Sequence, residues 1–136
     1  MNNRDPQILQ PANWLAPKGY VNGVVAEGRQ VFIAGQIGWN NQANLVSDDF
    51  VVQVEQALSN ITRILAEAGG LPHHLTRLTW YLTDKAAYVA RRREVGEAYR
   101  RVLGRHFPAM TLIVVADLLE EGAAVEIEAT AVIPVK

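Results

Sequence analysis

The most regular hydrophobic pattern in the chain runs from Asp48 to Ala68 and predicts a helix. Its apolar residues recur every three or four positions and form one stripe: Phe50, Val54, Ala57, Leu58, Ile61, Leu65 and Ala68. Ser47 or Asp48 can cap the first amides, and Gly69-Gly70 ends the pattern. A second helix with one apolar face is predicted from Thr83-Asp84 to about Leu103.

Short apolar or alternating runs predict the strands. Tyr20 to Ala26 and Val31 to Ile37 flank Glu27-Gly28, a turn signal, so 21–37 is predicted to be a β-hairpin. Leu75 to Leu82 is rich in Thr, Trp and Tyr, which favour strands. The runs 108–116 and 124–132 predict a final pair of strands. The predicted order is β-β-α-β-α-β-β.

This order predicts an α+β fold in which two helices cover one face of a five- or six-stranded sheet. The sheet's other face has no helix to cover it, yet Thr111 to Ala116 is apolar at both odd and even positions. We therefore expect other copies of the chain to cover that face. Residues 1–136 are predicted to form one domain, with 1–17 as an irregular N-terminal arm.

Composition narrows the classes of function. The 136 residues include no cysteine, so thiolate catalysis, disulfides and zinc-ribbon sites are excluded. A net charge of −1 has no signature for nucleic acids or acidic membranes. No apolar run is long enough to cross a membrane, and the first residues have no export signal, so a cytoplasmic protein is expected.

Few side chains are candidates for chemistry. Glu126 and Glu128 point to the same side of a strand, where one of them can act as a general base or both can simply be solvated. The run Arg91-Arg92-Arg93 is explained by a charged helix surface and also allows a phosphate or RNA patch. His73-His74 and His106 lack metal spacing, so no metal and no cofactor are expected.

Several stretches together resemble the RidA/YjgF family, also called the endoribonuclease L-PSP family. The likeness runs from about residue 18 to the end of the chain. The stretches are Gly19-Tyr20-Val21-Asn22-Gly23, Val31-Phe32-Ile33-Ala34-Gly35-Gln36-Ile37, Gln56-Ala57-Leu58 with Asn60-Ile61 and Leu65, Leu78-Thr79-Trp80-Tyr81-Leu82-Thr83-Asp84, Phe107-Pro108-Ala109 and Val125-Glu126-Ile127-Glu128-Ala129.

The resemblance implies a chorismate-mutase-like homotrimer with a ligand cleft at each subunit interface. In the best-known members this cleft hydrolyses reactive imines or enamines and releases ammonia. Three family positions are retained here. Glu126 matches the glutamate that positions water and is the expected catalytic residue, while Tyr20 and Gly35 match ligand-binding positions.

Other family positions have changed. Met110 stands where an arginine binds the substrate carboxylate, and Met has neither the charge nor the donors for that task. Ala34 replaces a serine, and Arg93 falls at the position of an asparagine and is a candidate to supply the missing charge. Leu112, on the strand of Met110, completes the expected ligand-binding set.

Three functions remain open from the sequence. The first is hydrolysis of an imine, an enamine or a related reactive metabolite other than the usual 2-aminoacrylate substrate. The second is a trimer that binds or senses a small molecule without catalysis. The third is action on RNA, although nucleic acid is not an expected partner. The sequence does not identify the ligand, because Met110 removes the residue that defines the substrate class.

Overall fold

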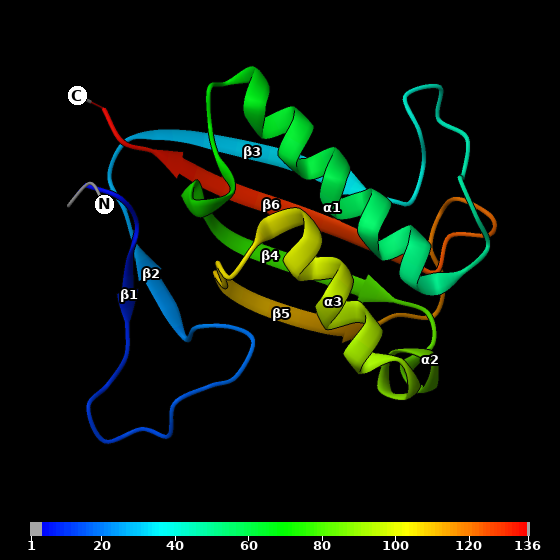
Figure 1. Ribbon diagram of the computed structural model, residues 1–136, viewed down its shortest axis with the longest axis horizontal. Coiled ribbons are helices and arrows are strands. Elements are labelled where there is room, and N and C mark those ends of the chain that lie inside the picture. Colours follow the sequence, from blue (N-terminus) through cyan, green and yellow to red (C-terminus); the bar gives the residue numbers. More distant parts are fainter. Residues whose placement is uncertain (1–3, 136) are drawn as a thin grey trace.

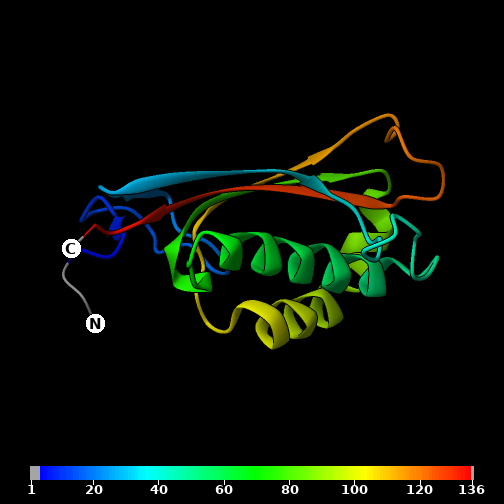
Figure 2. The ribbon, with the colours of Figure 1, turned by 90° about the horizontal axis from the view of Figure 1, so that it is seen from above.

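The computed structural model describes residues 4–135 and has two layers, a four-stranded sheet with helices on one face (Figures 1 and 2). The strand order in this sheet is β3-β6-β4-β5. The strands are β1 (Gln7–Leu9), β2 (Gly23–Val25), β3 (Arg29–Gln36), β4 (Leu75–Leu82), β5 (Ala109–Val114) and β6 (Val125–Ile133). The helices are α1 (Phe50–Glu67), α2 (Lys85–Ala90), α3 (Arg92–Leu103) and the 3₁₀ turn η1 (Pro72–His74).

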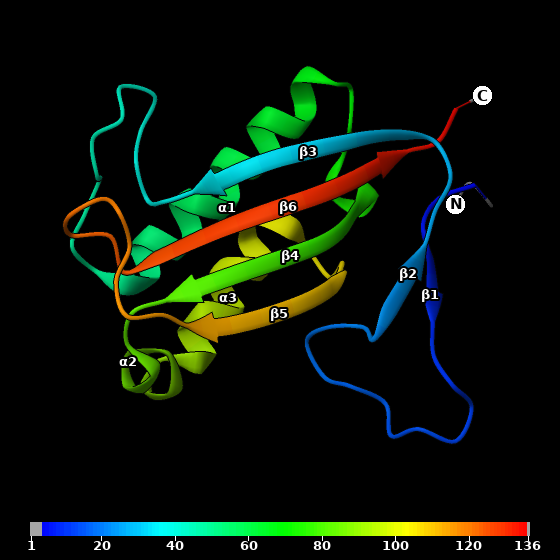
Figure 3. The same cartoon turned by 180° about the vertical axis from the view of Figure 1, so that it is seen from behind.

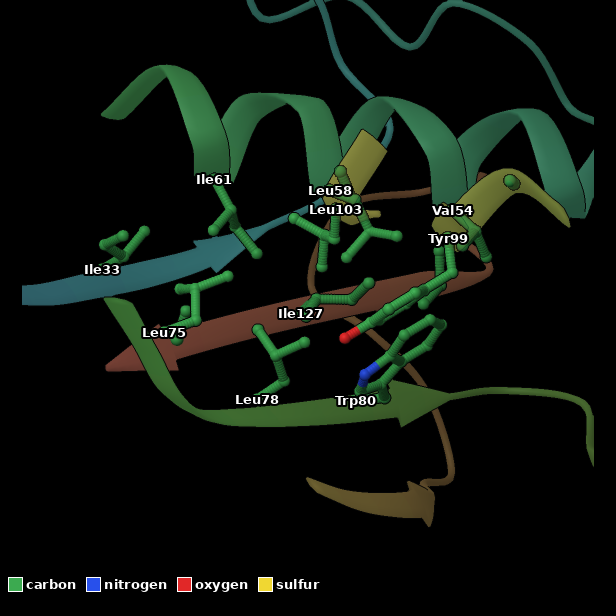
Figure 4. Close-up of a cluster of buried hydrophobic side chains, with 14 of the residues drawn as sticks. Ile33, Val54, Leu58, Ile61, Leu75, Leu78, Trp80, Tyr99, Leu103 and Ile127 are labelled. Carbon is green, nitrogen blue, oxygen red and sulfur yellow. The ribbon is translucent and has the colours of Figure 1, made fainter. Parts of the chain in front are cut away.

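Alternation along β4 and β6 separates the two faces of the sheet. On β6 every second residue from Val125 to Ile133 is buried, and the residues between them are only half-buried. The buried row packs against α1 and α3 in one hydrophobic core, which includes Leu58, Ile61 and Ile127 (Figure 4). Because β-strand side chains alternate in direction, Glu126 and Glu128 lie on the face without helices.

The predicted first helix is confirmed as α1, and its cap is one residue later than expected. The Asp49 side chain accepts a hydrogen bond from the Val52 amide at 3.1 Å and is the N-cap. Ser47 instead accepts from the Asp49 amide. Gly69, which has a positive φ of 80°, follows the C-terminal cap and allows the chain to leave the helix.

The prediction of one continuous second helix is wrong, because the helix breaks at Arg91. This residue has φ −119° and ψ 26°, which separates α2 from α3. Its guanidinium donates to Asp49 at 2.6 Å and to Glu94 at 2.7 Å. The hydrogen bond from Arg91 holds the pKa of the Asp49 carboxyl below its usual range. Through these two ion pairs, Arg91 links the first turn of α3 to the N-cap of α1.

The predicted hairpin over 21–37 is also wrong. Strand β2 pairs with β1, which lies in the arm expected to be irregular, and β3 pairs with β6 in the main sheet. The chain changes sheet near Gly28, where a side chain has no room because a Cβ would lie 2.8 Å from the Ile133 carbonyl carbon. Tertiary packing at this point overrides the local turn signal.

The last two strands form as predicted but are not neighbours. Strand β4 lies between them, parallel to β5 and antiparallel to β6. The segment from Val115 to Ala124 therefore crosses over one strand. Figure 3 shows the open face of all four strands from behind, with no helix across it. No helix within residues 4–135 has the length and hydrophobicity of a transmembrane segment.

Candidate functional site

Glu126 lies against Gly35 at a bulge between β6 and β3. The register shifts between Ile33 and Gln36, so that Ala34 and Gly35 together stand opposite Glu128. A Cβ at position 35 would lie 2.8 Å from the Glu126 carboxyl carbon and closer still to Oε2. Only glycine therefore leaves space for this carboxylate. Bulges of this kind commonly re-aim a side chain beside an active site.

The second carboxylate on this face has a partner within the chain. The Tyr81 hydroxyl donates to Glu128 Oε1 at 2.6 Å. This hydrogen bond is the main cause of the raised pKa of Tyr81, since losing the phenol proton would place an anion beside the carboxylate. Glu128 therefore has a structural partner, whereas within residues 4–135 the Glu126 carboxylate has no side-chain hydrogen bond. A hollow of about 530 Å³ beside this pair is lined in part by Ala34, Thr79 and Glu128.

A second group of predicted site residues gathers at the other edge of the sheet. Met110 is partly buried against the core and pairs in register with Leu78, so its side chain is on the helix-covered face. Leu112 follows on the same strand and is 39% exposed. Tyr20, 41% exposed, adjoins the start of β5 because the Val21 amide donates to the Pro108 carbonyl at 3.3 Å.

An aromatic stack lies beside the strand that carries Met110. The rings of Tyr99 and Phe107 have centroids 5.2 Å apart, and those of Trp80 and Tyr99 are 6.5 Å apart. Figure 4 shows Trp80 and Tyr99 meeting between β4 and α3. Burial raises the pKa of the Tyr99 hydroxyl, which donates to the His106 carbonyl at 2.6 Å. The Trp80 and Tyr99 rings belong to the core against which Met110 packs.

Arg93 stands apart from both groups in a single chain. Its side chain is 93% exposed on α3, and its Nε lies 3.4 Å from the Glu97 carboxylate. Neighbouring arginines are paired in the same way, Arg91 with Asp49 and Glu94, and Arg101 with Glu55 at 2.6 Å. These pairs neutralise much of the positive charge that the sequence concentrates on this helix.

A cluster of Asp5, His73 and His74 is the one metal-like grouping within residues 4–135, and its hydrogen bonding argues against a metal. The Leu71 amide donates to His74 Nδ1 at 3.0 Å, so in neutral His74 the proton must be on Nε2. That Nε2 lies 3.8 Å from Asp5 and has no lone pair for an ion. The cluster fits a carboxylate held between two imidazoles.

Two residues near Glu126 were not predicted from the sequence, although signals for both exist. Tyr81 lies in the polar row of β4 directly opposite Glu126, and its hydroxyl reaches diagonally to Glu128, so pairing the polar rows of β4 and β6 would have brought it to the two carboxylates. Gln53 is the one polar residue inside the apolar stripe of α1, and it is fully buried. A buried amide in such a stripe indicates a specific hydrogen-bonding role.

Comparison with known proteins identifies relatives along nearly the whole chain. The family model described as Endoribonuclease L-PSP matches residues 12–133. A 2-iminobutanoate/2-iminopropanoate deaminase from Capra hircus is 33% identical over 127 residues, which are 93% of this chain and 89% of the goat protein. Protein DfrA of Myxococcus xanthus is 33% identical over 109 residues, 79% of each chain.

Solved structures of proteins from the same family superpose on this chain. A crystal structure of YyfB from Yersinia pestis, described as a protein of unknown function in the conserved Rid family, superposes with a TM-score of 0.84 at 28% identity. The match covers 95% of this chain and 99% of the Yersinia chain. The predicted α+β fold with helices on one face of the sheet is therefore confirmed.

Proposed function

Because this chain belongs to the endoribonuclease L-PSP family, which is also the RidA/YjgF family, we propose that it hydrolyses the C=N bond of a small imine, or of the imine that an enamine forms by tautomerisation. The observation that carries the proposal is the contact between Glu126 and Gly35, where the backbone is shaped to admit a carboxylate on the open face of the sheet. A similar deaminase from goat, named for two imino acids, supports the class of reaction.

In the proposed mechanism Glu126 orients a water molecule and accepts one of its protons as the oxygen attacks the imine carbon. The C=N π electrons move to nitrogen, which takes up a proton, and a carbinolamine results. A second proton transfer lets the nitrogen leave as ammonia, and the remaining O–H proton is lost as the carbonyl forms. The reaction therefore consumes one water and needs no cofactor.

The complete site is proposed to lie between copies of the chain. Glu126 and Met110 are on opposite faces of the sheet, and two strand spacings, or about 10 Å, separate β6 from β5. One copy therefore does not enclose a ligand between them. A homotrimer, as the family resemblance implies, would bring Glu126, Gly35 and Ala34 of one copy to Tyr20, Met110 and Leu112 of the next. The open, partly apolar sheet face supports such an assembly.

The proposed substrate is uncharged at the end that meets Met110. Met110 offers no donor to a carboxylate, and it packs against a core that contains the stacked rings of Trp80 and Tyr99. Within one chain Arg93 points to solvent and pairs with Glu97, which favours an imine with an apolar substituent over an α-imino acid.

The test is a turnover assay on a panel of imines made in situ by an added oxidase with O2 as oxidant, some from amino acids and others from primary amines without a carboxylate. We expect ammonia release to be faster with neutral imines. Glu126→Gln should abolish the enzyme-dependent release of ammonia. Glu120→Gln, which changes an exposed loop carboxylate, should leave it unchanged. Equal turnover by wild type and Glu126→Gln would refute the role of Glu126.

A ligand-binding trimer without catalysis is the second candidate, favoured by the loss of the arginine, serine and asparagine at positions 110, 34 and 93. In that case a metabolite would raise the melting temperature while no imine is turned over. The RNA-acting candidate has less support, since Arg91, Arg93 and Arg101 pair with carboxylates. RNA binding that weakens steeply with salt would revive it.

A further inference from the structure

We propose that Gln53 and Asn60, two amides on α1, are positioning residues that hold Glu126 and Gly35 in their working geometry. The inference rests on the proposed function for its kinetic consequence, although its structural consequence can be measured without any substrate. Neither residue touches the open face of the sheet. Each acts through the backbone segments that it binds.

Gln53 fixes the chain as it enters β6. Its Nε2 donates to the Gly122 carbonyl and to the Ser47 carbonyl, each at 3.0 Å, and its Oε1 accepts from the Ala124 amide at 2.8 Å. The side chain is fully buried, so water does not compete for these bonds. Ala124 is two residues before Glu126, and its position sets where β6 begins.

The same side chain also meets the chain as it leaves β3. A Cβ at Gly38 would lie 2.6 Å from the Gln53 Cα and 2.7 Å from its Cβ. The segment three residues after Gly35 is therefore packed directly on the Gln53 stem. Gln53 is wedged between the two segments whose strands carry Gly35 and Glu126.

Asn60 secures the β3 side, two turns further along α1. Its Nδ2 donates to the Trp39 carbonyl at 2.9 Å and to the Ile37 carbonyl at 3.3 Å. Its Oδ1 accepts from Gln56, so the amide is oriented by its own helix. Because residues seven apart lie on one side of a helix, Gln53 and Asn60 reach both strand ends from a single rigid element.

The consequence is a dependence of the site on α1. The contact between Gly35 and Glu126 is tight enough that displacing either strand end shifts the carboxylate relative to the Gly35 backbone. Misplacement of a reacting group by about 1 Å can lower a rate about a hundredfold. The amides of α1 thus have a role in the site beyond core packing.

The experiment compares Gln53→Leu and Asn60→Ala with Thr62→Val, a control whose hydroxyl bonds only to the Ser59 carbonyl of the same helix. Amide hydrogen exchange of the intact protein gives a readout that needs no activity. In Gln53→Leu, exchange at Ala124 to Glu126 should accelerate at least about tenfold, with exchange in α3 unchanged. Crystal structures should show the Glu126 carboxylate displaced by about 1 Å.

With the imine identified by the turnover panel, Gln53→Leu should lower kcat about 10- to 100-fold with little change in KM. Gln53→Glu keeps the acceptor for Ala124 but places its second oxygen against the Gly122 and Ser47 carbonyls, so it should not recover this loss. If Gln53→Leu does not fold, Asn60→Ala carries the test through exchange at Ile37 to Trp39. Unchanged exchange and an unmoved Glu126 in the folded variants would overturn the inference. Displacement of Glu126 without any turnover in wild type would instead refute only the proposed function.

Discussion

Replacing Gly35 with alanine separates the function of Glu126 from the stability of the fold. The new Cβ would lie 2.8 Å from the Glu126 carboxyl carbon, against an ordinary contact of at least 3.4 Å, and nearer to Oε2. The carboxylate must therefore move away by about 1 Å. A displacement of this size should lower kcat about a hundredfold, which is about 2.7 kcal/mol added to the activation barrier.

Stability should change much less than activity. The atoms that obstruct the new methyl group belong to the end of a flexible side chain, which can rotate away without moving the backbone. Alanine also restricts the unfolded chain, an effect of about 0.4–1 kcal/mol in favour of folding. We therefore expect the free energy of unfolding to stay within about 1 kcal/mol of wild type.

The assay measures ammonia release from the best imine of the panel, together with urea unfolding of the same samples. Gly96→Ala is the matched control, because its Cβ would meet only the Arg100 side chain at 3.4 Å and lies on α3. Full activity in Gly35→Ala would show that the position of Glu126 does not matter to turnover. A large loss of stability would show that Gly35 serves the fold.

Three further predictions follow from the same structure. Met110→Arg should raise kcat/KM for α-imino acids about ten- to a hundredfold, because the arginine would add a charged hydrogen bond of about 1.5–3 kcal/mol to the substrate carboxylate. No gain for α-imino acids in the imine panel would contradict the proposed place of Met110 in the cleft. Wild type should sediment as a trimer. Phe32 is 74% exposed on the open face, so Phe32→Glu should shift the protein towards the 15.0 kDa monomer. A wild-type monomer at micromolar concentration would refute the assembly. Burial lowers the pKa of His74 and of His106. Below the unfolded-state pKa of about 6.5, the unfolded chain therefore binds protons that the native chain does not. The free energy of unfolding should then fall as the pH decreases from about 7 to about 5. His74→Asn, which keeps an acceptor for the Leu71 amide, should flatten that slope in urea titrations, and an unchanged slope would rule out His74 as its source.

Local pattern predicted the elements well where one periodicity dominated. The apolar stripe from Phe50 to Leu65 became α1, and Leu75 to Leu82 became β4 with the predicted bounds. Both succeed because burial on one face imposes a period on the sequence itself. The pattern failed at Arg91, where ion pairs to Asp49 and Glu94 interrupt an otherwise helical run.

The sequence predicted which residues belong to the candidate site, but it did not predict the contacts between them. Glu126, Gly35 and Tyr20 were identified by family resemblance, and their roles stay a proposal. The partner of Glu128 and the contacts of Gln53 with Gly122 and Ala124 were missed, because they join residues 47 to 71 positions apart in the chain.

The amino-acid sequence by itself determined which residues of β6 face the core, since strict alternation leaves only one face that can be buried. It also determined that one face of the sheet would lack a helix. Only the tertiary structure decided that β4 separates β5 from β6, that β2 leaves the main sheet, and that Glu126 meets Gly35 at a bulge. Strand order and register are set by long-range packing, and no local periodicity records them.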